Sequence, residues 1–117
     1  MKKSIVILIL LTVFKINAQQ KENKISEVKY KVRGNCGACK KRIENAADIK
    51  GVKIATWDSK SQELTITFRK DKVSEQQIKN EILKSGHDID SEKAPDEAYN
   101  KLPACCKFRE VKCEEEK

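Results

Sequence analysis

The sequence predicts a small α+β domain whose elements follow in the order β-α-β-β-α-β. Two segments alternate apolar with polar side chains, the period-two pattern of half-buried strands: Val28, Tyr30 and Val32 in the first, and Leu64, Ile66 and Phe68 in the second. A helix is expected over residues 39–47, and another strand over residues 52–57 pairs with the strand after it through a polar turn. Two halves around a central hairpin form the ferredoxin-like arrangement, an antiparallel sheet with two helices on one face.

The last helix of this arrangement has clear signals at both ends. Ser74 and Gln77 have the spacing of a capping box, which satisfies backbone N–H groups at the start of a helix. Two apolar residues occupy the hydrophobic-staple positions at the same end: Val73 and Ile78. Gly86 is placed to end the helix in a left-handed conformation, and residues 87–89 are expected to form a short closing strand.

The first 18 residues have the composition of a secretory signal peptide. Lys2 and Lys3 precede an apolar run, and Ala18 supplies a small residue at the expected cleavage position. The run is shorter than the roughly 18–20 residues that span a bilayer, so we expect no stable membrane insertion once the signal is removed. The sequence therefore predicts an exported, periplasmic protein whose mature chain starts with a flexible lead over residues 19–25.

The charge balance argues against a nucleic-acid partner. The whole chain has 25 basic and 18 acidic residues, a net charge of +7. Loss of the signal, which holds three lysines, leaves 22 basic residues and a net charge of +4. Charges of both signs are interspersed along the rest, whereas nucleic-acid binding favours a continuous basic surface.

The remaining chain divides into a domain over residues 26–90 and a tail over residues 91–117. The tail starts as a polar linker and has too few apolar residues for a core of its own. It contains three of the five cysteines: Cys105, Cys106 and Cys113. In an exported protein these thiols are expected to oxidise, to extend a metal site or to hold a second ion. An odd number of cysteines cannot pair entirely within one chain.

The chemistry-bearing motif is Cys36-Gly37-Ala38-Cys39, at the expected junction between the first strand and the first helix. Unpaired N–H groups and the positive helix end at such a junction favour anionic thiolates, and three basic residues follow at once. Two thiolates with few other ligands suit a soft ion, above all Cu(I), and by the same reasoning Hg(II); Zn(II) prefers four ligands. Cys36 and Cys39 are therefore the predicted metal ligands.

Around this motif the chain resembles the heavy-metal-associated (HMA) domain family, which includes copper chaperones and the periplasmic mercury-binding protein. The match lies in residues 32–44, in Gly51-Val52, in the strand around residues 65–68 and in Lys84-Ser85-Gly86-His87. The resemblance implies a ferredoxin-like fold, Cys36 and Cys39 as ligands on an exposed loop, and metal carriage by ligand exchange. A metal-transporting P-type ATPase or an efflux system is the kind of partner expected for such a carrier.

The chain differs from the family at one position near the loop, and a second position, His87, has two possible roles. The family usually has Met two residues before the first ligand cysteine, where it supports the loop, and this chain has Gly34. The substitution puts loop rigidity and metal preference in doubt without removing a ligand. His87 falls where relatives often carry an aromatic residue near the loop, so it is either an auxiliary ligand or a half-packed residue at the start of a strand.

Three functions remain open from the sequence. The leading one is an exported metallochaperone or sequestering protein for a soft ion, which is not an enzyme and has no catalytic residues or organic cofactor. The runner-up is a thiol-disulfide oxidoreductase using the same two cysteines, since a Cys-Gly-x-Cys string also begins a helix in thioredoxins. The third is an adaptor that docks on a partner and delivers no metal.

Overall fold

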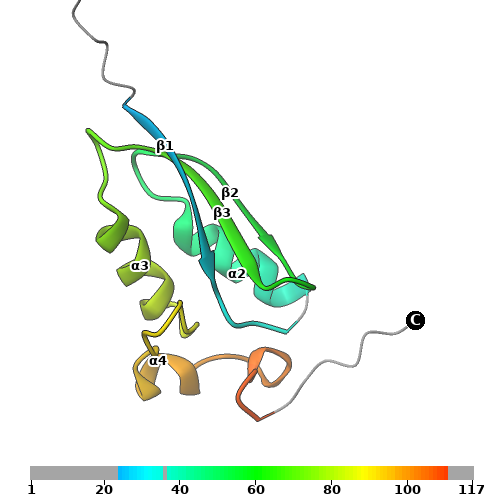
Figure 1. The fold of residues 1–117 in the computed structure, drawn as a ribbon. Coiled ribbons are helices and arrows are strands. Elements are labelled where there is room, and N and C mark those ends of the chain that lie inside the picture. Colours follow the sequence, from blue (N-terminus) through cyan, green and yellow to red (C-terminus); the bar gives the residue numbers. More distant parts are fainter. Residues whose placement is uncertain (1–23, 36, 111–117) are drawn as a thin grey trace, which may run out of the picture.

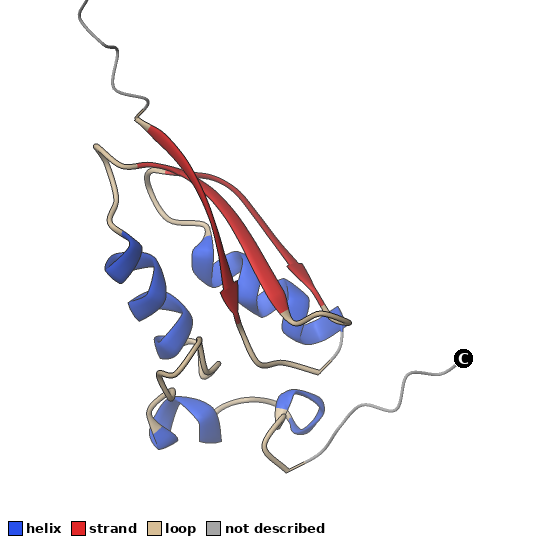
Figure 2. Ribbon diagram, viewed as in Figure 1, coloured by secondary structure: helices blue, strands red, loops and turns tan. Residues whose placement is uncertain are grey.

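The computed structural model describes residues 24–35 and 37–110, and within them it forms an open three-stranded sheet with two helices on one face (Figures 1 and 2). The elements are β1 (Ile25–Lys31), α2 (Gly37–Ala47), β2 (Val52–Asp58), β3 (Glu63–Arg69), α3 (Glu75–Lys84), α4 (Asp96–Asn100) and the 3-10 helix η2 (Ala104–Cys106). The expected signal peptide and Cys113 lie outside the described residues. The helices of the described part are all too short, and not apolar enough, to cross a membrane.

The sheet has the order β1-β3-β2, with both neighbouring pairs antiparallel. Leu64 lies opposite Tyr30 on one side and opposite Trp57 on the other, and all three side chains are buried. The alternation seen in the sequence is therefore confirmed: β3 buries its apolar side chains against α2 and α3. This ferredoxin-like arrangement is the predicted fold.

The predicted closing strand is reduced to a bridge. Ile89 pairs with Val32 beyond the end of β1, and residues 87–89 form no strand. Asp90 explains the early end, because it adopts a left-handed conformation (φ 49°) and its carboxylate accepts a 2.9 Å hydrogen bond from the backbone N–H of Lys31. The chain turns there instead of continuing along β1.

The signals at the ends of α3 are confirmed. Ser74 and Gln77 form both hydrogen bonds of the capping box. Gly86 has φ +97°, and a Cβ atom there would lie 2.8 Å from the carbonyl oxygen of Ala98. Glycine is thus required both by the conformation and by the close approach of α4.

The segment after Asp90 differs from the expected linker. It forms α4 and η2, which lie at the end of the sheet where β1 finishes and α2 begins (Figure 1). It has no core of its own, as expected, but adds four residues to the core of the domain: Tyr99, Leu102, Cys106 and Phe108. This packing has no signal in the sequence, because these residues follow neither a helical nor a strand period.

Candidate metal site

Cys39 lies in the first turn of α2, directly after the loop that leaves β1. Its side chain is fully buried. The resemblance implied an exposed ligand loop, so this burial is a difference, and it arises because η2 packs against α2. Cys36, the other predicted ligand, lies outside the described residues.

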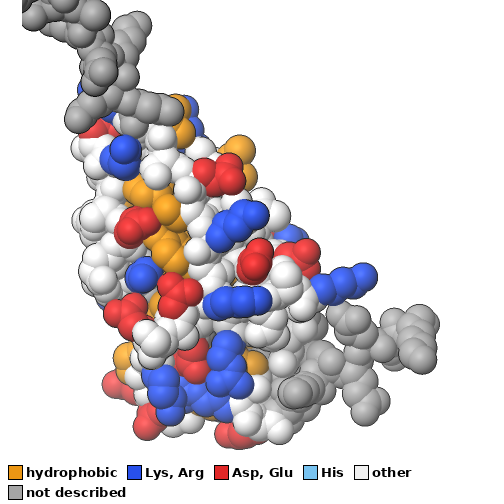
Figure 3. Space-filling model, in the orientation of Figure 1, with side chains coloured by type: hydrophobic (Ala, Val, Ile, Leu, Met, Phe, Trp, Pro, Cys, Tyr) orange, Lys and Arg blue, Asp and Glu red, His pale blue; other side chains and the backbone are white. Residues whose placement is uncertain are grey.

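The start of α2 has a positive local potential. Its first turn contains no acidic side chain, so the unpaired N–H groups of this eleven-residue helix are not countered locally. Of the three basic residues after Cys39, Lys40 is engaged elsewhere: its Nζ donates to the carbonyl oxygen of Trp57 and pairs with Glu44, both at 2.9 Å. Lys41 and Arg42 remain exposed. On the face shown in Figure 3, acidic and basic side chains are otherwise interspersed.

The side chain of Trp57 packs directly against Gly34, the position where the family usually has methionine. A Cβ atom on Gly34 would lie 3.0 Å from Cζ2 of Trp57 and 3.1 Å from Cβ of Cys39. The indole is 1% exposed, and its Nε1 donates a 2.9 Å hydrogen bond to the carbonyl oxygen of Val32. The contact of Trp57 with Gly34 depends on the position of β2 beside the loop, which the sequence does not show.

The tail brings two further thiols to the buried Cys39. Cys106 in η2 is fully buried and forms no disulfide with a described cysteine, and Cys105 beside it is exposed. Burial raises the pKa of the Cys106 thiol, and the neighbouring thiols of Cys39 and Cys105 raise it further. The carbonyl oxygen of Cys105 also accepts a 3.2 Å hydrogen bond from Nδ2 of Asn35 in the loop.

His87 is buried next to the loop backbone. Its Nδ1 lies 2.8 Å from the carbonyl oxygen of Arg33, and its ring stacks on Phe108 with centroids 5.6 Å apart. Burial lowers the pKa of His87, and the positive charge of nearby Arg42 lowers it further. The hydrogen bond with the Arg33 carbonyl acts in the opposite direction and raises that pKa. The buried Nε2 has no hydrogen-bond partner. His87 thus links the backbone of the loop at Arg33 to Phe108 of the tail. Its role as an auxiliary ligand stays a prediction.

An ion pair holds the tail against the domain. The guanidinium of Arg109 contacts Asp88 twice, with Nη2 2.6 Å from Oδ1 and Nε 3.4 Å from Oδ2. Asp88 is almost fully buried, and its Oδ1 also accepts a 2.8 Å hydrogen bond from the backbone N–H of Ala94. Burial acts to raise the pKa of Asp88, but the bonds from Arg109 and Ala94 outweigh it and hold that pKa below its ordinary value. The pair has no local signal in the sequence, because its partners are 21 residues apart in the chain.

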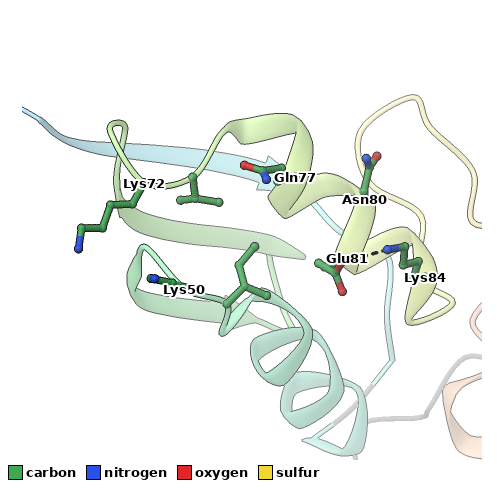
Figure 4. Close-up of a pocket in the computed structure, with 8 residues that line it drawn as sticks. Lys50, Lys72, Gln77, Asn80, Glu81 and Lys84 are labelled. Carbon is green, nitrogen blue, oxygen red and sulfur yellow. Dashed lines mark hydrogen bonds and ion pairs between the residues drawn. The ribbon is translucent and has the colours of Figure 1, made fainter.

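No set of three His, Cys, Asp or Glu side chains within residues 24–35 and 37–110 is arranged to hold a metal ion. A groove between the end of α2 and α3, with a volume of about 510 Å³, is lined by lysines, polar side chains and two apolar ones (Figure 4). It contains none of the predicted ligands. The thiols at the start of α2 therefore remain the candidate site.

The fold and this loop together define a ferredoxin-like domain with a thiol-bearing loop, and solved structures identify the family. No family profile matches the chain, and no curated protein does. The chain is similar to a CopZ metallochaperone, with 30% identity and a TM-score of 0.53 over 55% of this chain and 98% of that one. It is also similar to a copper-binding domain from HMA7, a P-type ATPase, with 27% identity and a TM-score of 0.53 over 55% of this chain and 89% of that one.

The fold likeness extends to oxidised MerP from Ralstonia metallidurans CH34, at 22% identity and a TM-score of 0.53 over 56% of this chain and 93% of that one. The chain belongs to the heavy-metal-associated domain family.

Proposed function

We propose that this protein binds a soft metal ion, Cu(I) first among them, through the thiolates of Cys36 and Cys39 and passes it on by ligand exchange. The observation that carries the proposal is the place of Cys39, in the first turn of α2 at the end of the loop from β1. The positive end of a helix stabilises a negatively charged metal–thiolate site placed against it. The similarity to a metallochaperone and to a copper-binding domain supports the same reading.

The chemistry requires no catalytic group. Thiolates prefer soft ions, and each thiol that becomes a ligand releases one proton to water. Transfer then consists of replacing one thiolate at a time by a ligand of the receiving protein. The similarity to a P-type ATPase domain makes such a transporter our proposed partner.

The experiment is a competition for Cu(I) between the purified, reduced chain and a coloured chelator. We expect one tightly held Cu(I) per chain, and loss of binding when Cys36→Ser and Cys39→Ser are combined. Ala38→Ser is the matched control, because it adds a hydroxyl between the same two cysteines without changing a thiol. Retention of Cu(I) by the double variant would contradict the proposal.

The oxidoreductase alternative makes the opposite prediction in an assay of insulin reduction. A metal carrier produces no sustained reduction of insulin. An oxidoreductase reduces insulin continuously, and that activity depends on Cys36 and Cys39. The adaptor hypothesis predicts that loaded protein transfers no ion to the metal-binding domain of a transporter.

Export is the other part of the proposal. The apolar run after Lys2 and Lys3 and the small residue at Ala18 support it. Cell fractionation and N-terminal sequencing test it, with a mature chain beginning at Gln19 in the periplasm as the expected result. A chain that keeps Met1 in the cytoplasm contradicts it.

A further inference from the structure

Two buried thiols from distant parts of the chain lie side by side at the proposed metal site. Cys39 and Cys106 are both fully buried where η2 packs against α2, and the proximity of Cys39 contributes to the raised pKa of Cys106. They are separated by 66 intervening residues, so only the docking of the tail brings them together. Neither is bonded to another cysteine.

This juxtaposition is maintained by contacts that do not involve the thiols. Phe108 inserts between His87 and the edge of Tyr99, with ring centroids 5.6 and 5.3 Å away. Arg109 pairs with Asp88 and lies 4.2 Å over the ring of Tyr99. η2 is therefore placed on α2 by an ion pair and by aromatic packing on its C-terminal side.

The charged groups near Cys39 and Cys106 bear on the free-energy cost of burying a metal–thiolate cluster there. A soft ion with three thiolates has a net negative charge, which is costly to bury unless positive groups lie close by. The N-terminus of α2 has no acidic side chain in its first turn. Arg33, whose guanidinium lies 5.1 Å over the ring of Phe108, brings a positive charge next to the tail, and it shares that charge with the carboxylate of Asp88, 3.7 Å away.

We propose that Cys106 of the tail is a third thiolate ligand for the ion held at Cys39, so that the tail closes the metal site. This inference rests on the proposed function and adds a ligand to it. Cys105 is exposed, so we place it outside the coordination shell. Binding releases the thiol protons of the ligands to water, with no change in oxidation state. Because η2 covers Cys39, transfer to a partner then requires displacement of the tail.

The test is X-ray absorption on the purified, reduced chain loaded with Cu(I). We expect three sulfur ligands in the unaltered chain and two in Cys106→Ser, with longer copper–sulfur bonds in the former. Cys106→Ala is a second variant, because alanine avoids a buried hydroxyl if the serine variant folds poorly. Ala104→Ser is the matched control on η2, and it should keep three sulfurs.

Chelator competition gives an independent readout. Loss of one ligand should lower the Cu(I) affinity of Cys106→Ser by about tenfold or more and speed Cu(I) removal by excess chelator. Two sulfurs in the unaltered chain, or Cys106 variants that match it in affinity and removal rate, overturn the inference. So does loss of the third sulfur in Cys105→Ser alone.

Failure of the proposed function looks different. In that case the unaltered chain holds no Cu(I), or the combined Cys36→Ser and Cys39→Ser variant holds as much as the unaltered chain. If only the third ligand is wrong, the double variant still loses its copper and the Cys106 variants do not.

Discussion

Replacing Gly34 by methionine, the residue usual at this position in the family, should destabilise this protein. The new side chain would start 3.0 Å from Cζ2 of Trp57 and 3.1 Å from Cβ of Cys39. Neither neighbour can yield easily, because the indole is 1% exposed and bonded to the carbonyl of Val32, and Cys39 is fixed in α2. Overpacking of this kind costs about 1–3 kcal/mol.

A double-mutant cycle tests whether Trp57 has taken the place of the methionine. Trp57→Ala alone should lower the free energy of unfolding by roughly 3–5 kcal/mol, because it leaves a large cavity. In the combined Gly34→Met and Trp57→Ala variant the methionine can occupy part of that cavity. We therefore expect the pair to be more stable than the sum of the single changes by about 0.5–3 kcal/mol.

The assay is urea unfolding followed by circular dichroism, since the chain has one Trp and fluorescence is lost with it. Gly34→Ala is a graded control and should cost less than Gly34→Met. A Gly34→Met protein as stable as the unaltered one, or strictly additive changes, would refute the account of Trp57 as the support of the loop.

Three further predictions concern the tail, His87 and α3. Arg109→Ala should destabilise the protein by about 3 kcal/mol, the low end for breaking a buried pair because Arg109 is partly exposed; hydrogen exchange should increase over residues 94–109, and unchanged exchange contradicts the role of the pair. The pKa of His87 is lowered in the folded state, so its neutral form stabilises the protein above the unfolded-state pKa near 6.5, and this stability is lost as the pH falls below that value. The urea midpoint of the metal-free chain should accordingly be lower at pH 5.5 than at pH 7.5, and the difference should be smaller in His87→Asn. An equal decrease in both proteins contradicts this role of His87. Ser74→Ala should cost about 0.5–2 kcal/mol by removing the capping box, measured by urea unfolding, with Ser59→Ala in the hairpin turn as the control that should not change.

The parts of the fold that the sequence predicts are those with local signals. Ser74 and Gly86 mark the ends of α3 through hydrogen bonds and a backbone conformation that involve only nearby residues. The alternation in β3 follows from one buried face. The strand expected over residues 87–89 is only a bridge in the structure. The chain turns away at the hydrogen bond between Asp90 and Lys31, two residues that meet only in the folded chain.

The candidate site likewise combines a feature with a local sequence signal and a feature that depends on tertiary contacts. A Cys-x-x-Cys string before a helix is a local signal, and it indicated Cys39 as a candidate ligand. The approach of Cys106 could not be read from the sequence, because it depends on Phe108 reaching His87 and on Arg109 reaching Asp88. These contacts are set by tertiary packing, and single apolar residues in a charged tail have no period to reveal them.

The central claim is that thiolates at the start of α2 hold a soft metal ion, and X-ray absorption at the copper edge tests it most directly. The reduced, Cu(I)-loaded chain should show a first shell made only of sulfur, and the combined Cys36→Ser and Cys39→Ser variant should show no such shell. A first shell of nitrogen and oxygen in the unaltered chain, or a sulfur shell that survives in the double variant, contradicts the claim.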